Sequence, residues 1–181
     1  MPASSPNQLT AAPAAGFEQP FEMLGACHER VARMLDLLAR LQAHVARHGA
    51  DEQARQAARD VMRYFDLAAP QHHLDEERHV LPALEAAGDP ALALLAARLR
   101  SDHRRMEDGW MRVRQVLSGL AEGTTAALDP AQQAALEAFA ALHADHLAAE
   151  DGTAFPAAAR RLDAAAHQAM SADMRQRRGV R

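Results

Sequence analysis

Hydrophobic residues recur at every third or fourth position along four long stretches of the chain. That spacing places apolar side chains on one face of a helix. The stretches end at glycines or begin at Asp-Pro pairs, which are common helix boundaries. We therefore predict four amphipathic helices, at about 21–48, about 51–87, from Asp89 to between Gly119 and Gly123, and at about 129–156.

Short connections between these helices favour antiparallel neighbours. The predicted fold is therefore all-α, an up-down-up-down four-helix bundle over residues 21–156. Residues 1–20 are rich in Pro, Ala and Ser and are predicted to be disordered, whereas 157–181 read as a short C-terminal helix with a basic tail. Pro70 falls inside the second helix and should kink or split it.

Four histidines occupy positions in the apolar stripes where a hydrophobic residue is expected: His28, His72, His103 and His146. Counted from the predicted turns, all four lie within about one helical turn of a common height. A single core histidine is usually a hydrogen-bonded residue. Four at one height indicate a shared site, because isolated buried polar groups are costly.

Glutamates follow these histidines at helical spacing. Among 181 residues with 10 His, a His four positions before a Glu occurs five times, against about 0.6 expected by chance. Three of these pairs fall on the stripes: His72/Glu76, His103/Glu107 and His146/Glu150. Residues four apart share one helix face. A layer of imidazoles and carboxylates from four helices suits two iron or manganese ions.

Composition narrows the remaining classes of protein. The 20 basic and 24 acidic residues give a net charge of −4, which argues against a nucleic-acid partner. Cys27 is the single cysteine, so no internal disulfide forms, and a reducing, cytoplasmic location is expected. No apolar run approaches 18 residues, and the first residues lack the features of a secretory signal. We therefore expect no membrane association.

Four parts of the sequence together resemble the haemerythrin-like (HHE cation-binding) domain. They are His28, HHLDEERHVLPAL at 72–84, DHRRMED at 102–108 and HLAAED at 146–151. A single HxxxE motif would be weak, but the combination over 21–156 is specific. The resemblance implies a four-helix bundle with an oxo- or hydroxo-bridged non-haem di-iron centre. Such a centre binds O₂, peroxide or nitric oxide, or serves in sensing or storage. Manganese or zinc also suits this ligand set.

The resemblance also implies a ligand set. It places His28 and His72 on one iron, His103, Glu107 and His146 on the other, and Glu76 and Glu150 between the two metals. The oxygen-carrying haemerythrins have a histidine where this chain has Glu107. An anionic oxygen ligand stabilises the ferric state, which argues against a reversible O₂ carrier and favours sensing, iron handling, or peroxide and nitric oxide chemistry.

Neighbouring residues leave alternatives open. His73 and Glu77 form a pair rotated about 100° around the helix axis, so they are expected behind the ligands or toward solvent, unless the register shifts by one. Asp151 could take the place of Glu150 as the carboxylate that bridges the two metals. His143 is expected to line the site or its access path, one turn before a ligand.

Two other function classes fit the pattern less well. A ferritin-like di-iron oxidase needs a Glu-x-x-His motif on each of two helices, and only Glu76 and His79 match it. A metal-free helical interaction module would give a colourless protein whose stability does not depend on metal. The pattern favours binding over catalysis and leaves the oligomeric state open.

Overall fold

The computed structural model describes residues 16–180, and every regular element in that range is a helix. The all-helical prediction is confirmed. The predicted disordered segment 1–20 lies outside the described residues except for its last five positions. In chain order the elements are α1 (Pro20–His48), α2 (Glu52–Leu67), α3 (Ala69–Asp75), the π-helix η1 (Glu76–Val80), α4 (Leu81–Glu85), α5 (Pro90–Glu122), α6 (Pro130–Ala149), the π-helix η2 (Glu150–Ala154), α7 (Phe155–Ala159) and α8 (Ala164–Arg177).

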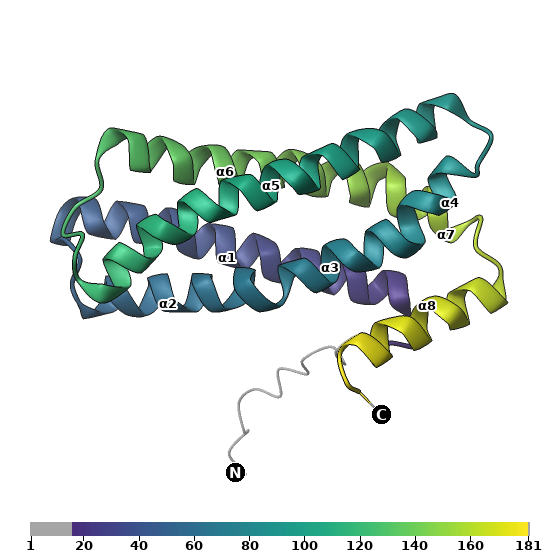
Figure 1. Cartoon of the computed structure of the whole chain (residues 1–181), viewed down its shortest axis with the longest axis horizontal. Coiled ribbons are helices and arrows are strands. Elements are labelled where there is room, and N and C mark those ends of the chain that lie inside the picture. Colours follow the sequence, from purple (N-terminus) through teal and green to yellow (C-terminus); the bar gives the residue numbers. More distant parts are fainter. Residues whose placement is uncertain (1–15, 181) are drawn as a thin grey trace, which may run out of the picture.

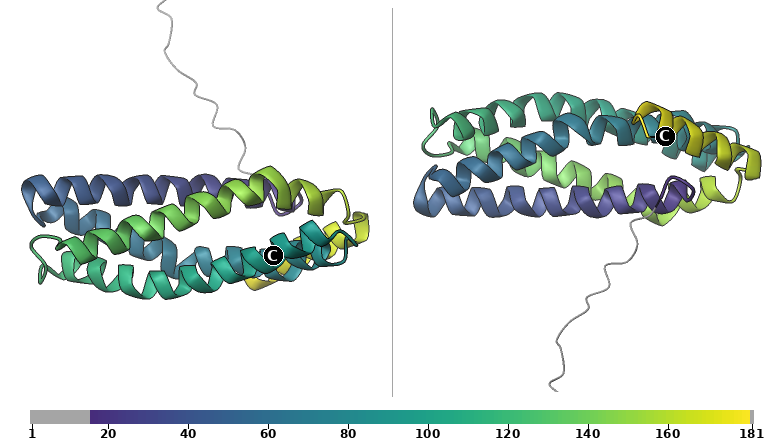
Figure 2. Two further views of the ribbon diagram at one scale, coloured as in Figure 1. Left: turned by 90° about the horizontal axis from the view of Figure 1, so that it is seen from above. Right: turned by 90° about the horizontal axis from the view of Figure 1, so that it is seen from below.

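Four long helical segments lie alongside one another (Figures 1 and 2). The first segment is α1 and the second comprises α2, α3, η1 and α4. The third is α5, and the fourth comprises α6, η2 and α7. The closest packing joins α2 to α5, α5 to α6 and α1 to α2. The short helix α8 lies against one end of this arrangement (Figure 1).

The predicted helix boundaries at the Asp-Pro pairs are confirmed. Asp89 caps α5 by accepting the backbone N–H of Ala91, and Asp129 caps α6 by accepting that of Gln132. The proline that follows each aspartate occupies the first turn, where its missing N–H costs nothing. Gly123 ends α5 with a φ of +75°, in the left-handed region that glycine tolerates best.

The second predicted helix is interrupted twice. The break expected at Pro70 is confirmed, because α2 ends at Leu67 and α3 begins at Ala69. The second interruption, the π-helical turn η1, was not predicted, and neither was its counterpart η2 in the last long segment. The turn η1 begins four residues after His72, and η2 begins four residues after His146.

The core consists of two apolar clusters with a polar layer between them. Along α1, Leu24 belongs to one cluster and Val31 to the other, and His28 lies between them. Along α5, Leu99 and Val113 flank His103 in the same way. Hydrophobic packing on both sides therefore holds the polar layer away from water. Within residues 16–180, no helix is long and apolar enough to span a membrane.

Candidate metal centre

Six of the seven side chains predicted as ligands meet in the polar layer between the two clusters. One group consists of His28, His72, Glu76 and Glu150, and a second consists of His103, His146 and the same two glutamates. Within each group the ligand-type atoms all lie within 4.8 Å of one another. None of the six residues is more than 4% exposed. The common height inferred from the turns is therefore confirmed.

Each glutamate divides its two carboxylate oxygens between the groups. Glu76 Oε1 lies 3.0 Å from His72 Nε2, and Glu76 Oε2 lies 3.3 Å from His103 Nε2. Glu150 approaches one histidine of each group in the same way, at 3.2 and 3.1 Å. A carboxylate that presents one oxygen to each of two ligand groups could bridge two cations.

The close nitrogens and oxygens of this layer are not hydrogen-bonded to each other. Among the described residues, ten buried side-chain atoms lack a hydrogen-bond partner, and all ten belong to these six residues. Leaving a buried polar atom unpaired costs about 1–3 kcal/mol. Eight of the ten are the four Nε2 nitrogens and the four carboxylate oxygens that approach one another, so the donor set fits a pair of cations.

The helix turn after Glu76 is a π turn. Leu81 donates its backbone N–H to the carbonyl of Glu76, five residues earlier. The next residue, Pro82, has no N–H, and in an α-helix its ring would crowd the carbonyl four residues back. The wider π turn relieves this clash. It therefore lets the helix continue past the proline while Glu76 stays in the buried layer.

The same local pattern occurs a second time. The spacing H-x₃-E-x₅-P covers residues 72–82 and again 146–156, and a second π turn begins at Glu150. Phe155 donates its N–H to the Glu150 carbonyl, again five residues apart. This repeat is visible in the sequence, although it was not used to predict the π turns. Such turns are frequent at functional sites.

Two carboxylates contact the Nδ1 atoms of histidines, on the side of the ring away from the shared glutamates. His28 Nδ1 lies 2.8 Å from Asp151 Oδ1, and His103 Nδ1 lies 2.9 Å from Glu77 Oε1, both in hydrogen-bond geometry. Asp151 and Glu77 each directly follow one of the two shared glutamates. A carboxylate in this position fixes the orientation of an imidazole and increases its basicity toward a metal. Glu150 belongs to both ligand groups, whereas Asp151 contacts only the rear nitrogen of His28.

The other two histidines have different neighbours. His146 Nδ1 lies 3.8 Å from Asp102 Oδ2, whereas His72 has the Cys27 thiol as a neighbour that affects its pKa. Burial alone would raise the pKa of the Cys27 thiol, but the contact with His72 outweighs it and lowers that pKa. The sequence did not lead us to predict that Asp102 would lie near His146 or Cys27 near His72. Asp102 and Cys27 each directly precede a clustered histidine, and this position in the sequence was the available signal.

Charge coupling within the layer shifts the pKa values of its members. Burial would lower the pKa of His28, but the adjacent Glu150 and Glu76 carboxylates raise it to about 9. Burial would raise the pKa of Glu76, and the surrounding imidazoles, His72 foremost, hold it well below its usual value. In the absence of a cation, these carboxylates favour the protonated form of His28. A bound metal would replace that proton.

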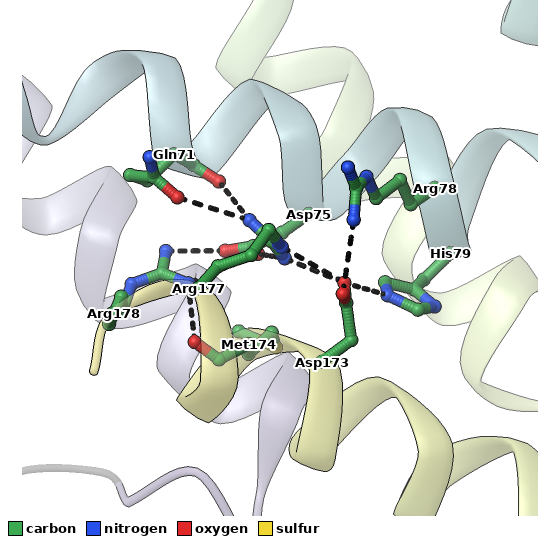
Figure 3. Close-up of polar contacts among 8 residues, drawn as sticks. All are labelled: Gln71, Asp75, Arg78, His79, Asp173, Met174, Arg177 and Arg178. Carbon is green, nitrogen blue, oxygen red and sulfur yellow. Dashed lines mark hydrogen bonds and ion pairs between the residues drawn. The ribbon is translucent and has the colours of Figure 1, made fainter. Parts of the chain in front are cut away.

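A buried cluster of ion pairs joins α8 to α3, the helix directly before Glu76. Asp75, directly before Glu76, is completely buried and is paired with Arg177 and with Arg178, whose Nη2 lies 2.6 Å away (Figure 3). Arg177 also donates to the carbonyl of Gln71 at 3.4 Å. These contacts join residues about 100 positions apart, and nothing in the local sequence around Asp75 indicates them.

On the other side of this cluster, Asp173 of α8 receives two side chains from η1. Arg78 donates to Asp173 at 3.1 Å, and His79 Nε2 lies 2.8 Å from the same carboxylate (Figure 3). His79 is thus turned toward α8 and belongs to neither ligand group. The Glu-x-x-His match that a ferritin-like site would require is not brought together in the buried layer.

Glu107 is the one predicted ligand that the structure does not bring to the layer. Its side chain is exposed and it is absent from both groups. The ring of His73 lies against His103 instead, stacked at 4.2 Å with 10° between the ring planes. The sequence argument against an oxygen carrier rested on Glu107 as a ligand, so it loses its basis in this geometry.

His73 and His143 lie next to the layer without joining either group. Burial and the neighbouring His103 lower the pKa of His73 well below its usual value. Burial lowers the pKa of His143 to about 4, although Nδ1 donates a hydrogen bond to the Phe139 carbonyl at 2.9 Å. The expectation that both histidines lie outside the ligand groups agrees with this arrangement. His72 rather than His73 faces the shared glutamates.

Comparison with known proteins places this geometry in a family. The model of the Hemerythrin HHE cation binding domain matches residues 19–158, a span that contains all six clustered residues. An uncharacterised protein of Haemophilus influenzae is 31% identical over 96 residues, which cover 53% of this chain and 55% of that protein. The chain thus spans about half the length of the curated relative that it matches. Since the family model covers most of its length, the chain belongs to the hemerythrin HHE cation-binding domain family.

Proposed function

We propose that this chain is a non-haem di-iron protein of haemerythrin-like type, folded as an up-down-up-down four-helix bundle. In this proposal it binds O₂ or a related small ligand such as nitric oxide or peroxide, in sensing or storage. The observation that carries the proposal is the pair of buried ligand groups that share two glutamates and contain ten unpaired polar atoms.

In this proposal each of the six residues has a role. His28 and His72 would hold one iron, His103 and His146 the other, and Glu76 and Glu150 would bridge them. Imidazole with carboxylate suits iron, and the two carboxylates offset part of the charge of two cations. Manganese and zinc are the alternatives for the same donor atoms.

Each metal position receives four protein atoms, two imidazole nitrogens and two carboxylate oxygens. Non-haem iron sites with so few protein ligands keep positions open for an exogenous ligand. Iron would supply ligand binding and electron-transfer chemistry at those positions. The chain contributes a layer shielded from water by two apolar clusters, with carboxylates orienting His28 and His103 from behind.

The alternative functions are less consistent with the geometry. A ferritin-like oxidase would use His79, whose ring is engaged by Asp173 on α8. A metal-free interaction module would leave the ten buried atoms permanently unpaired, at a cost that few folded proteins accept. Both observations favour the two-metal site.

The test is the metal content and near-ultraviolet and visible spectrum of protein purified in air, before and after adding azide. We expect two irons per chain and absorption bands that shift with azide, since open positions admit an anion. Loss of thermal stability on treatment with a chelator should accompany them. Absence of iron and of absorption bands, even after anaerobic reconstitution, would contradict the proposal.

A further inference from the structure

A small apolar pocket adjoins the second ligand group. It has a volume of about 60 Å³, which corresponds to about two water molecules at about 30 Å³ each. The pocket is lined by Phe65, Ala69, Pro70, His73, Met106, Glu107, Trp110, Phe139 and His143. Three of its walls, Phe65, Met106 and Phe139, are at most 3% exposed. The pocket thus reaches from the surface into the buried core.

Aromatic rings form the side walls of this pocket. The ring of Phe65 lies 5.1 Å from those of both Trp110 and Phe139. Phe139 in turn lies 4.3 Å from the ring of His143. Because these rings pack against one another, they form rigid side walls for the pocket. The break between α2 and α3 at Pro70 lies at the rim of the pocket.

His73 forms the inner end of the pocket. Its ring is stacked on His103 at 4.2 Å and lies 6.4 Å from the ring of His146. Both neighbours belong to the second ligand group. A molecule in the pocket would therefore be separated from this metal position by the thickness of one imidazole. A rotation of the His73 side chain would connect the pocket with the space between the ligands of the second group.

The polarity of the pocket selects for an uncharged occupant. His143 directs Nδ1–H to the Phe139 carbonyl and lines the pocket as a neutral ring. Glu107 is the one residue with a formal charge among those lining the pocket, and it lies on the exposed side. A carboxylate at the entrance disfavours anions by charge repulsion. Apolar walls accept small neutral molecules such as xenon or a diatomic gas.

We propose that this pocket is the docking site and entry route for an uncharged ligand of two or three heavy atoms, which passes His73 to the metal position held by His103 and His146. The inference rests on the proposed function for its last step. The docking step depends only on the pocket, so it is testable in the metal-free protein.

The first experiment is xenon binding to the wild-type, metal-free protein in crystals under xenon pressure. We expect one xenon atom among Phe65, Met106 and Phe139. Crystals with no xenon in this pocket would overturn the docking site. Because wild-type protein is used, the result does not depend on the folding of a variant.

The second experiment fills the pocket by Ala69→Leu in the iron-loaded protein. The matched control is Ala57→Leu, which places the same side chain in a surface groove along α2, away from the ligand layer. We expect Ala69→Leu to slow nitric oxide association at least about tenfold and to abolish xenon binding, while Ala57→Leu changes neither. Equal association rates in the two variants would overturn the entry route.

A third comparison tests the charge selection. Glu107→Gln should accelerate azide association and leave nitric oxide association unchanged, because only the anion is repelled by the carboxylate. Unchanged azide kinetics would overturn the role given to Glu107. The metal content of every sample is measured separately. Xenon in the pocket of a chain that binds no iron would sink the proposed function and leave the docking site standing, and two irons without xenon would do the reverse.

Discussion

The ligand layer is built from two halves with the same plan. The first half consists of α1, α3 and η1, and the second consists of α5, α6 and η2. Each half supplies one histidine from an unbroken helix and one H-x₃-E pair followed by a π turn and a proline. The duplicated spacing explains why the two ligand groups have the same composition.

The surroundings of the two halves differ. Asp75 precedes the glutamate of the first half and is clamped by α8, whereas Ala149 stands at the matching position of the second half. Glu107 lies one turn after the histidine of α5, where α1 has Ala32. The two halves therefore contribute equally to the ligand groups, whereas the α8 anchor contacts only the first half and the apolar pocket adjoins the second.

Removing a shared glutamate should have the largest effect. Glu76→Ala and Glu150→Ala each delete an oxygen from both groups, so we expect either variant to lose both metals. Metal content by mass spectrometry is the measurement. Glu137→Ala on the exposed face of α6 is the control and should retain two. A glutamate variant that holds one metal tightly would show that the halves are not coupled through these residues.

Removing a single histidine should affect only one position. His72→Ala in the first half and His103→Ala in the second should each bind about one iron and lose the charge-transfer bands of the pair. His48→Ala, an exposed histidine on α1, serves as the matched control. If His72→Ala keeps two irons, the assignment of His72 fails and His73 becomes the residue to test.

Breaking the α8 clamp should destabilise the first half. Arg177→Gln combined with Arg178→Gln leaves the buried Asp75 carboxylate without a cation, which costs about 3–5 kcal/mol. The free energy of unfolding of the metal-free protein in urea measures this effect. Arg175→Gln is the control, because its pair with Glu18 is exposed and contributes about 0–1 kcal/mol. Equal losses in both variants would argue against the clamp.

Removing the carboxylates behind the histidines should have the smallest effect. Asp151→Ala and Glu77→Ala each release an imidazole from its orienting partner, which typically costs about 10–100-fold in metal affinity. Competition with a calibrated chelator measures the affinity. Asp145→Ala, exposed on α6, is the control. Affinities unchanged from wild type would mean that Asp151 and Glu77 do not support the ligands.

Periodicity predicted much of this molecule because it reports which side chains share a helix face. Six clustered residues and the break at Pro70 follow from such local spacing. Glu107 obeys the same i,i+4 rule and still lies outside, because a shared face does not determine which atoms meet across helices. The buried state of Asp75 depends on arginines about 100 residues away, which no local pattern reveals.

The account is tested most directly by a crystal structure of the iron-loaded protein with data collected at the iron absorption edge. We expect two anomalous peaks in the buried layer, each next to two histidine Nε2 atoms and both between the carboxylates of Glu76 and Glu150. A single peak, a peak coordinated by Glu107 or His73, or no peak in this layer would contradict the two-metal site.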